Sequence, residues 1–568
     1  MSTTKHTLRA IFAAAALLLL LDKACFAEEP KLPFTISAET TRVTSPLTKI
    51  GLVDYFAALE KRYYPPEFAT DDNGFRIFIR QFGNVAETTK DDEFYRLQKY
   101  GKLGLDSTVP PTLQYPLEPW KIVEEFYKAK GEKVPEKLLL RGEVLGNLLR
   151  PWTLKEFPML ADWVNEMDKP LDAIAEAVRK PVFFIPFLQS PDSMESGKPQ
   201  NLIAVLLPDL YQVRTTARLF AARASYRIAQ GSIDGAIEDK LTIHRLGRQV
   251  SASGPLVQYL VGIAIEGMAA TIQVGANPKH PLTKEQAQRL LAGLDALPPR
   301  TSLEHAYEWE RFMALDAAQS FATGEDTFFD IKLPTQMLRF AVDWDVTFRQ
   351  VNEAYDALQE PPPREKWHKM VKAFEEKKQW VATFPLMSAN NRGVLVADML
   401  IAILMPALDA VETATYRSEC SDNLQRLTLA MLMYQNEHGK LPDKDWAAQI
   451  EKYLGKNPEQ YFSCPSKPSP KGETVYAMVH YGDLREPATV SPTGDIVPGS
   501  RDTILLIELA EPVPLNRAVV PVDTAMEECQ RPGKRHHTAG MNVGYRSGVV
   551  RFMPQPVSEA ELHRLLTP

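Results

Sequence analysis

The chain has 568 residues, of which 45% are hydrophobic and 24% are charged, and its formal net charge is -7 at pH 7. This length is sufficient for two or three domains with sizeable hydrophobic cores. The acidic balance, without a long run of Lys and Arg, argues against nucleic acid as a partner because phosphate binding requires a basic surface.

Residues 1–27 have the pattern of a signal peptide. Lys5 and Arg9 precede the apolar run Ala10–Leu21, which is too short to cross a bilayer, and Ala27 ends a small-x-small cleavage site. We therefore expect cleavage after Ala27 and an exported chain, periplasmic or extracellular. An uncleaved signal anchor is the alternative.

Residues 28–50 are rich in Pro and Thr and predict an extended lead-in, whereas residues 51–386 predict an all-helical domain. Within this domain we expect two helices over 154–178, divided at Pro170, and one helix over 335–359. The apolar segment 256–274 contains Gly262 and Gly267, which suit close contact with another helix. Thr283 and Gln286 have the spacing of a helix cap.

Residues 387–568 predict a second domain, with a long helix over 393–438 and a β-rich tail over 470–555. Pro406 should kink this helix, and Gly439 is placed to cap its C-terminus. The apolar segment Val394–Leu408 is short and contains Asp398, so packing against the helical domain is favoured over a membrane span. We expect an α+β fold, predominantly α, with an all-α N-terminal region and a long helix packed on a small antiparallel β-sheet.

Three cysteines remain after removal of the signal peptide: Cys420, Cys464 and Cys529. Export exposes them to oxidising conditions, so one disulfide and one odd thiol are expected. Three pairings are possible, and we favour Cys420 with Cys464 because this bond would join the long helix to the loop that follows it.

The segment Arg392–Pro442 resembles the N-terminal part of prepilin-type, pseudopilin-like proteins. The resemblance rests on an apolar half-helix, a Cys-x-x-Asn-Leu-x-x-Leu segment and a Tyr-x-x-x-x-Gly-x-x-Pro end. It extends to a Phe-Ser-Cys-Pro-Ser stretch and to an H-x9-DG signature in which Ser replaces Asp. The matching positions are Cys420, Asn423, Leu424, Leu427, Tyr434, Gly439, Pro442, Cys464, His537, Asn542, Val543, Ser547 and Gly548.

This resemblance implies a pilin-like helix and sheet and a place in a cell-envelope or secretion assembly. We expect a non-enzymatic protein that acts by protein–protein interaction with an unknown envelope partner and that binds no nucleic acid. Membrane contact is not favoured. A periplasmic hydrolase with its site between helices, and a membrane-tethered pseudopilin, are the alternatives.

No catalytic, cofactor or metal site is expected from the sequence. Cys529 with His536 and His537 has a spacing that matches no zinc motif. His305 and Glu308 lie one helical turn apart and predict a solvated helix face. His537, Ser547 and Gly548 are expected to have structural roles at a β-hairpin.

Overall fold

The computed structural model describes residues 32–83, 90–112, 119–135, 148–196, 201–324, 335–358, 383–481, 503–530, 537 and 540–554. The single positions 206, 208, 253, 276, 278, 456 and 467 are left out, and a few isolated residues, such as 557, 558 and 562, are included. The predicted signal peptide therefore lies outside the described residues. So do the side chains of Leu404 and Pro406.

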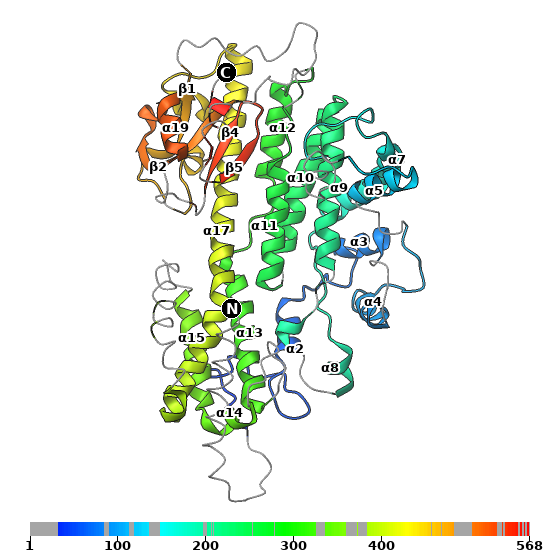
Figure 1. Ribbon diagram of the computed structural model, residues 1–568, viewed down its shortest axis with the longest axis vertical. Coiled ribbons are helices and arrows are strands. Elements are labelled where there is room, and N and C mark those ends of the chain that lie inside the picture. Colours follow the sequence, from blue (N-terminus) through cyan, green and yellow to red (C-terminus); the bar gives the residue numbers. More distant parts are fainter. Residues whose placement is uncertain are drawn as a thin grey trace, which may run out of the picture.

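The part of the chain before residue 386 folds entirely as helices and connecting segments wherever the structure describes it. Its helices, shown in blue to green in Figure 1, are α2 Tyr55–Tyr63, α3 Gly74–Phe82, α4 Lys90–Lys102, α5 Pro119–Ala129, α7 Ala161–Ala177, α8 Pro191–Ser196, α9 Asp209–Ala229, α10 Ile233–Ser251, α11 Leu256–Ala270, α12 Lys284–Asp295, α13 Leu303–Thr323, α14 Thr335–Ala341 and α15 Trp344–Leu358.

Local capping explains several helix starts. Asn73 accepts the N–H of Phe75 at the start of α3. The predicted cap of α12 is confirmed as a full capping box, in which Thr283 and Gln286 each accept a main-chain N–H from the other.

Two expected helix boundaries are wrong. α7 continues through Pro170, which is buried like Leu171 and Ile174, so the lost main-chain hydrogen bond does not end the helix. The segment 335–359 forms two helices instead of one. Asp343 separates them because its side chain accepts the N–H of Val346 and caps α15.

The longest element is α17, Ala389–His438, a helix of 50 residues that extends about 75 Å at 1.5 Å per residue. Its main chain stays helical through position 406. It begins after Ser388, whose side chain accepts the N–H of Asn391, and ends at Gly439, which adopts φ 73° and donates to the carbonyl of Gln435. In Figure 1 the helix runs along the length of the molecule, past α15 and α13 and then between the sheet and the helices α11 and α12.

The first half of α17 packs one face against the helical region. Leu400, Ile401, Leu408 and Val411 retain 4%, 3%, 1% and 0% of their exposure and belong to a core that includes α13 and α15. Ile403, at 44%, faces outward. Among the described residues, no helix combines the length and the hydropathy that crossing a bilayer requires.

The second half of α17 packs on a five-stranded sheet of order β3-β1-β2-β4-β5. The strands are β1 Glu473–His480, β2 Ile504–Pro514, β3 Val519–Pro521, β4 Gly540–Tyr545 and β5 Val550–Pro554. The helix α19, Val522–Gln530, follows β3 and contacts β1 and β2.

The sheet is mixed, so the expectation of an antiparallel sheet is wrong at one edge. β1 pairs with β2, β2 with β4 and β4 with β5 in antiparallel fashion, but β3 is parallel to β1. The short helix η8, Leu515–Arg517, reverses the chain after β2 and places β3 at the outer edge of β1. The carbonyl of Ala518 accepts the N–H of Met478 and the indole N–H of Trp446, which fixes this edge. The coarser prediction, an α+β fold that is mostly helical, is confirmed.

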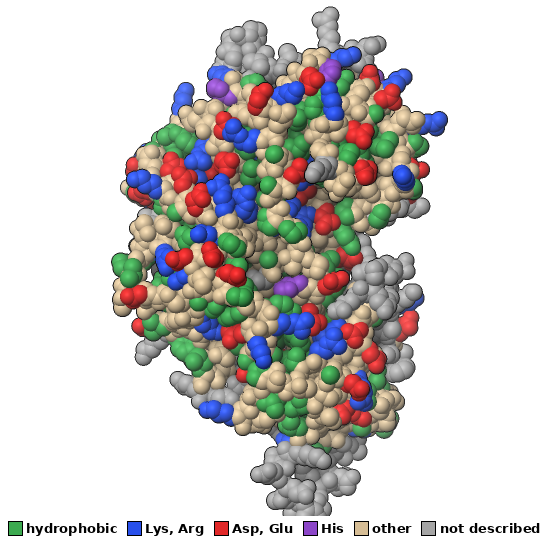
Figure 2. Space-filling view, turned by 180° about the vertical axis from the view of Figure 1, so that it is seen from behind, with side chains coloured by type: hydrophobic (Ala, Val, Ile, Leu, Met, Phe, Trp, Pro, Cys, Tyr) green, Lys and Arg blue, Asp and Glu red, His purple; other side chains and the backbone are tan. Residues whose placement is uncertain are grey.

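One continuous core joins the helical region to the tail. It extends from Leu241 and Leu290, on α10 and α12, through Leu424 and Leu427 on α17 to Tyr476 on β1. On the face shown in Figure 2, the acidic and basic side chains of the described residues are interspersed.

Candidate functional site

Four side chains with metal-binding and redox chemistry meet between α17 and the sheet. They are Cys420 on α17, Cys464 in the link after η7 (Pro458–Phe462), Glu508 on β2 and His537 before β4. We call them the Cys–His–Glu cluster. The two Sγ atoms lie 2.6 Å apart, Cys464 Sγ is 3.8 Å from His537 Nε2, and this nitrogen is 3.3 Å from Glu508 Oε1.

The surrounding chain explains why these residues converge. Cys420 lies one turn before Leu424 on the buried side of α17, which faces the sheet. Asn423, also on α17, donates to the carbonyl of Ser463 at 3.0 Å and so holds the link beside the helix. His537 forms a bridge with Gly540, at the start of β4.

The cluster is closed to solvent. Both cysteines have 0% exposure, and the side chains of His537 and Glu508 retain 1% and 3%. Asn542 holds the Glu508 carboxylate: its main-chain N–H donates to Oε2 at 2.6 Å and its side-chain amide to Oε1 at 3.3 Å. Such contacts stabilise a buried carboxylate that would otherwise be costly.

Burial and pairing have opposite effects on the pKa of His537 but act in the same direction on that of Cys420. Burial disfavours the imidazolium of His537, but hydrogen bonds and charge interactions with Cys464 and Glu508 outweigh it and raise its pKa to about 9. Burial, followed by the contact with Cys464, raises the pKa of Cys420 well above its ordinary value. The metal-free site therefore favours a neutral Cys420 thiol and a protonated His537 at neutral pH.

The structure brings together some of the predicted residues and separates others. Cys420 and Cys464 are adjacent, as the favoured pairing requires, but no disulfide joins the described cysteines, so that bond stays a prediction. Cys529 is buried on the other side of the sheet region, in a core with α19 and Leu562, and lies outside the cluster. His536 lies outside the described residues.

Sequence reasoning missed Glu508. Glu508 is the single charged residue within the apolar run of β2, Ile504–Ala510, where an isolated carboxylate must find a buried partner. That break in the pattern was the available signal, but the position of His537 opposite it depends on sheet pairing. Asn542 is one of the positions on which the resemblance rests, but the resemblance did not predict its contact with Glu508.

The β4–β5 turn contacts the helical region. Gly548 adopts φ +80° in this turn and donates to the carbonyl of Tyr545 at 3.0 Å. A Cβ added at Gly275, which follows α11, would lie 2.5 Å from the carbonyl oxygen of Ser547, so the two segments approach closely there.

A buried ionic network connects the helical region with α17. Arg300 donates to Glu266 of α11 and to Asp422 of α17, both at 2.9 Å, and Arg248 of α10 reaches the same two carboxylates at 3.3 and 3.4 Å. Their side chains retain between 1% and 13% exposure. Burial opposes the ionised form of Asp422, yet Arg300 and its other cationic neighbours hold its pKa below the ordinary value.

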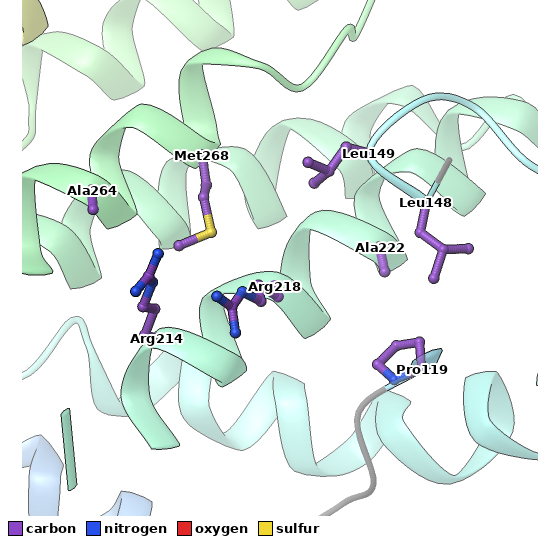
Figure 3. A pocket seen from close by; sticks show the side chains of 8 residues that line it. All are labelled: Pro119, Leu148, Leu149, Arg214, Arg218, Ala222, Ala264 and Met268. Atoms are coloured by element: carbon purple, nitrogen blue, oxygen red, sulfur yellow. The ribbon is translucent and has the colours of Figure 1, made fainter. Parts of the chain in front are cut away.

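A hollow of about 180 Å³ lies between α9, α11 and α5. Arg214 and Arg218, one turn apart on α9, reach toward it in Figure 3, and the remaining wall is apolar. The lining residues are Pro119, Leu148, Leu149, Arg214, Arg218, Ala222, Ala264 and Met268. The described residues that line the hollow provide guanidinium groups but no carboxylate or imidazole, so they do not form the acid–base pair that a hydrolase needs.

The prediction that His305 and Glu308 lie on a solvated face of α13 is wrong. Glu308 is buried, with 7% exposure, and pairs with Arg62 and Arg311, while His305 is half-buried beside the ring of Tyr63. The face packs because α2 lies against it, a long-range contact that local spacing does not reveal.

Glu310, also on α13, gives a prediction for pH dependence. Burial raises its pKa from 4.5 to about 7, and its hydrogen bond from the N–H of Leu256 offsets this only in part. Because the folded state holds this proton more tightly, the contribution of Glu310 to stability is highest below about pH 4.5 and falls as the pH rises to 7. Glu310→Gln should remove most of this fall and stabilise the chain at pH 8 by about 1–2 kcal/mol, measured by urea unfolding at pH 5 and pH 8. An equal loss of stability at both pH values would contradict the prediction.

No family model, curated protein or solved structure matched the chain in comparisons with known proteins.

Proposed function

We propose that this chain is an exported, non-enzymatic protein of a cell-envelope or secretion assembly, which acts by protein–protein interaction through its helical region and a pseudopilin-like tail. The observation that carries the proposal is α17. One helix of 50 residues is a core element of the helical region in its first half and the support of a small sheet in its second half.

The pseudopilin-like assignment rests on the positions of the motif residues. Cys420, Leu424 and Leu427 lie on the buried side of α17, Asn423 binds the link that carries Cys464, and Gly439 ends the helix. His537 and Gly548 lie at the two ends of the segment that contains β4 and its turn. The quoted motifs thus occupy the contact between helix and sheet.

The same helix argues against a filament subunit. Assembly of pilin-like filaments would require an exposed apolar half-helix, but Leu400 and Leu408 are already covered by α13, α15 and their neighbours. A membrane-tethered pseudopilin would require the same surface. The alternative of a hydrolase is not supported by the arginine-lined hollow, because none of its described lining residues carries a carboxylate or an imidazole.

The test is export followed by identification of partners. The full chain is produced with its own N-terminus in a host with two membranes, and the proteins of the envelope are crosslinked. The chain is then purified, and its mass is measured by mass spectrometry. A mature chain that begins at Glu28 and crosslinks reproducibly to specific envelope proteins is the expected result. Leu18→Arg with Leu20→Arg, which places charges in the apolar signal segment, is the control that should remain uncleaved and uncrosslinked. A cytosolic wild-type chain, or a purified chain that hydrolyses envelope polymers, would refute the proposal.

A further inference from the structure

We propose that Cys420, Cys464, Glu508 and His537 form a Zn²⁺ site in the reduced form of the chain. The inference does not rest on the proposed function. It comes from four residues, far apart in the sequence, that the fold brings to one point.

The donor set has the composition of a structural zinc site. Two thiolates, one imidazole nitrogen and one carboxylate oxygen are all ligands that zinc accepts, and a closed site of four ligands requires no water. The four donor atoms lie within 4.8 Å of one another, and all four residues are buried.

Of three separations between ligand atoms, two already suit a tetrahedral site and the third requires a small movement. Zinc bonds of about 2.0–2.3 Å place neighbouring ligand atoms roughly 3.3–3.8 Å apart. The separations of His537 Nε2 from Cys464 Sγ, 3.8 Å, and from Glu508 Oε1, 3.3 Å, already have these values. The two sulfur atoms, at 2.6 Å, would move apart by about 1 Å to admit the ion.

Neighbouring groups already hold two of the ligands in place. Asn542 binds both oxygens of Glu508, and the hydroxyl of Ser466 lies 3.0 Å from Cys464 Sγ, where it can donate to a thiolate. Outer contacts of this kind orient metal ligands and contribute to affinity. The ion would connect α17, the link after η7, β2 and the segment before β4, and so fasten the sheet to the long helix.

Oxidation excludes the metal. If a small-molecule disulfide accepts two electrons and two protons from the thiols, it is reduced to two thiols, and Cys420 and Cys464 become a disulfide. Both thiolate ligands are then lost. Zinc binding and the expected disulfide are therefore alternative states of one site, and both connect the helix to the same link.

The experiment uses the full chain, purified under reducing conditions and freed of metal. Titration with Zn²⁺ against a coloured chelator should give one tightly bound ion per chain, and Co²⁺ should give the thiolate-to-cobalt charge-transfer band of a tetrahedral site. The cobalt spectrum tests thiolate ligation in the wild-type chain, so the result does not depend on a variant that folds.

Matched variants locate the site. Cys464→Ser should lose the charge-transfer intensity of one thiolate and at least tenfold in zinc affinity, whereas Cys529→Ser, a substitution of the third buried cysteine, should retain both. Oxidation with glutathione disulfide should abolish binding. A reduced chain that binds no stoichiometric zinc, an oxidised chain that still binds it, or a Cys464→Ser chain with unchanged affinity would each overturn the proposal.

Discussion

Replacing Arg300 by methionine is expected to lower the free energy of unfolding by about 3–5 kcal/mol, the largest effect among the substitutions considered. The guanidinium of Arg300 holds Glu266 and Asp422 together at 2.9 Å from each, with 1% and 13% exposure of their side chains. Methionine fills a similar volume but leaves both carboxylates with only Arg248 as a shared cationic partner. The two buried carboxylates then share one guanidinium group, that of Arg248, instead of two.

The matched control for this prediction is Arg289→Met. Arg289 also pairs with a carboxylate, that of Asp234, at 2.7 Å, but the two side chains are 54% and 56% exposed. An exposed pair contributes about 0–1 kcal/mol. Urea unfolding of the chain from residue 28 should therefore separate the two variants clearly. Equal and small effects would show that the buried network does not stabilise the contact of α17 with α10 and α11.

Gly262→Ala is expected to destabilise the chain by about 3 kcal/mol because α10 and α11 approach too closely to admit a methyl group. A Cβ at Gly262 would lie 2.5 Å from the carbonyl oxygen of Gly247 and 2.7 Å from Cβ of Ser251. A Cβ at Gly247 would lie 2.7 Å from the carbonyl oxygen of Gly262. These neighbours are main-chain or rigid atoms, so only a shift of one helix could relieve the overlap.

Gly267→Ala, on the same helix, provides the comparison. A Cβ there would meet no atom within 4 Å, and the residue is exposed. Alanine in a helix interior is favoured over glycine by up to about 1 kcal/mol, so this variant should be neutral or slightly more stable. Thermal unfolding of the two variants checks the prediction. A Gly262→Ala chain as stable as Gly267→Ala would mean that the two helices are not in this close contact.

Local signals in the sequence predicted local structure well. Thr283 and Gln286 form the expected cap, Gly439 ends the long helix with a positive φ, and the turn at Gly548 needs the conformational freedom of glycine. In each case a few neighbouring residues determine the conformation.

Features that depend on distant contacts were missed. The parallel edge strand β3 results from a chain reversal after β2, and the burial of Glu308 results from the packing of α2. Gly262 and Gly267 both lie on α11, but only Gly262 is in close contact with another helix. Their spacing in the sequence does not indicate which of the two makes this contact. The pairing of Glu508 with His537 likewise depends on the sheet register.

The central claim is that the apolar first half of α17 is a core element of its own protein. Hydrogen exchange of main-chain amides in the chain from residue 28 tests it most directly, because protection reports the free energy of local opening. We predict that amides of residues 395–411 exchange as slowly as those of 424–433, which lie against the sheet and the helical region. Rapid exchange over 395–411, with protection kept over 424–433, would contradict the claim and leave an uncovered apolar half-helix.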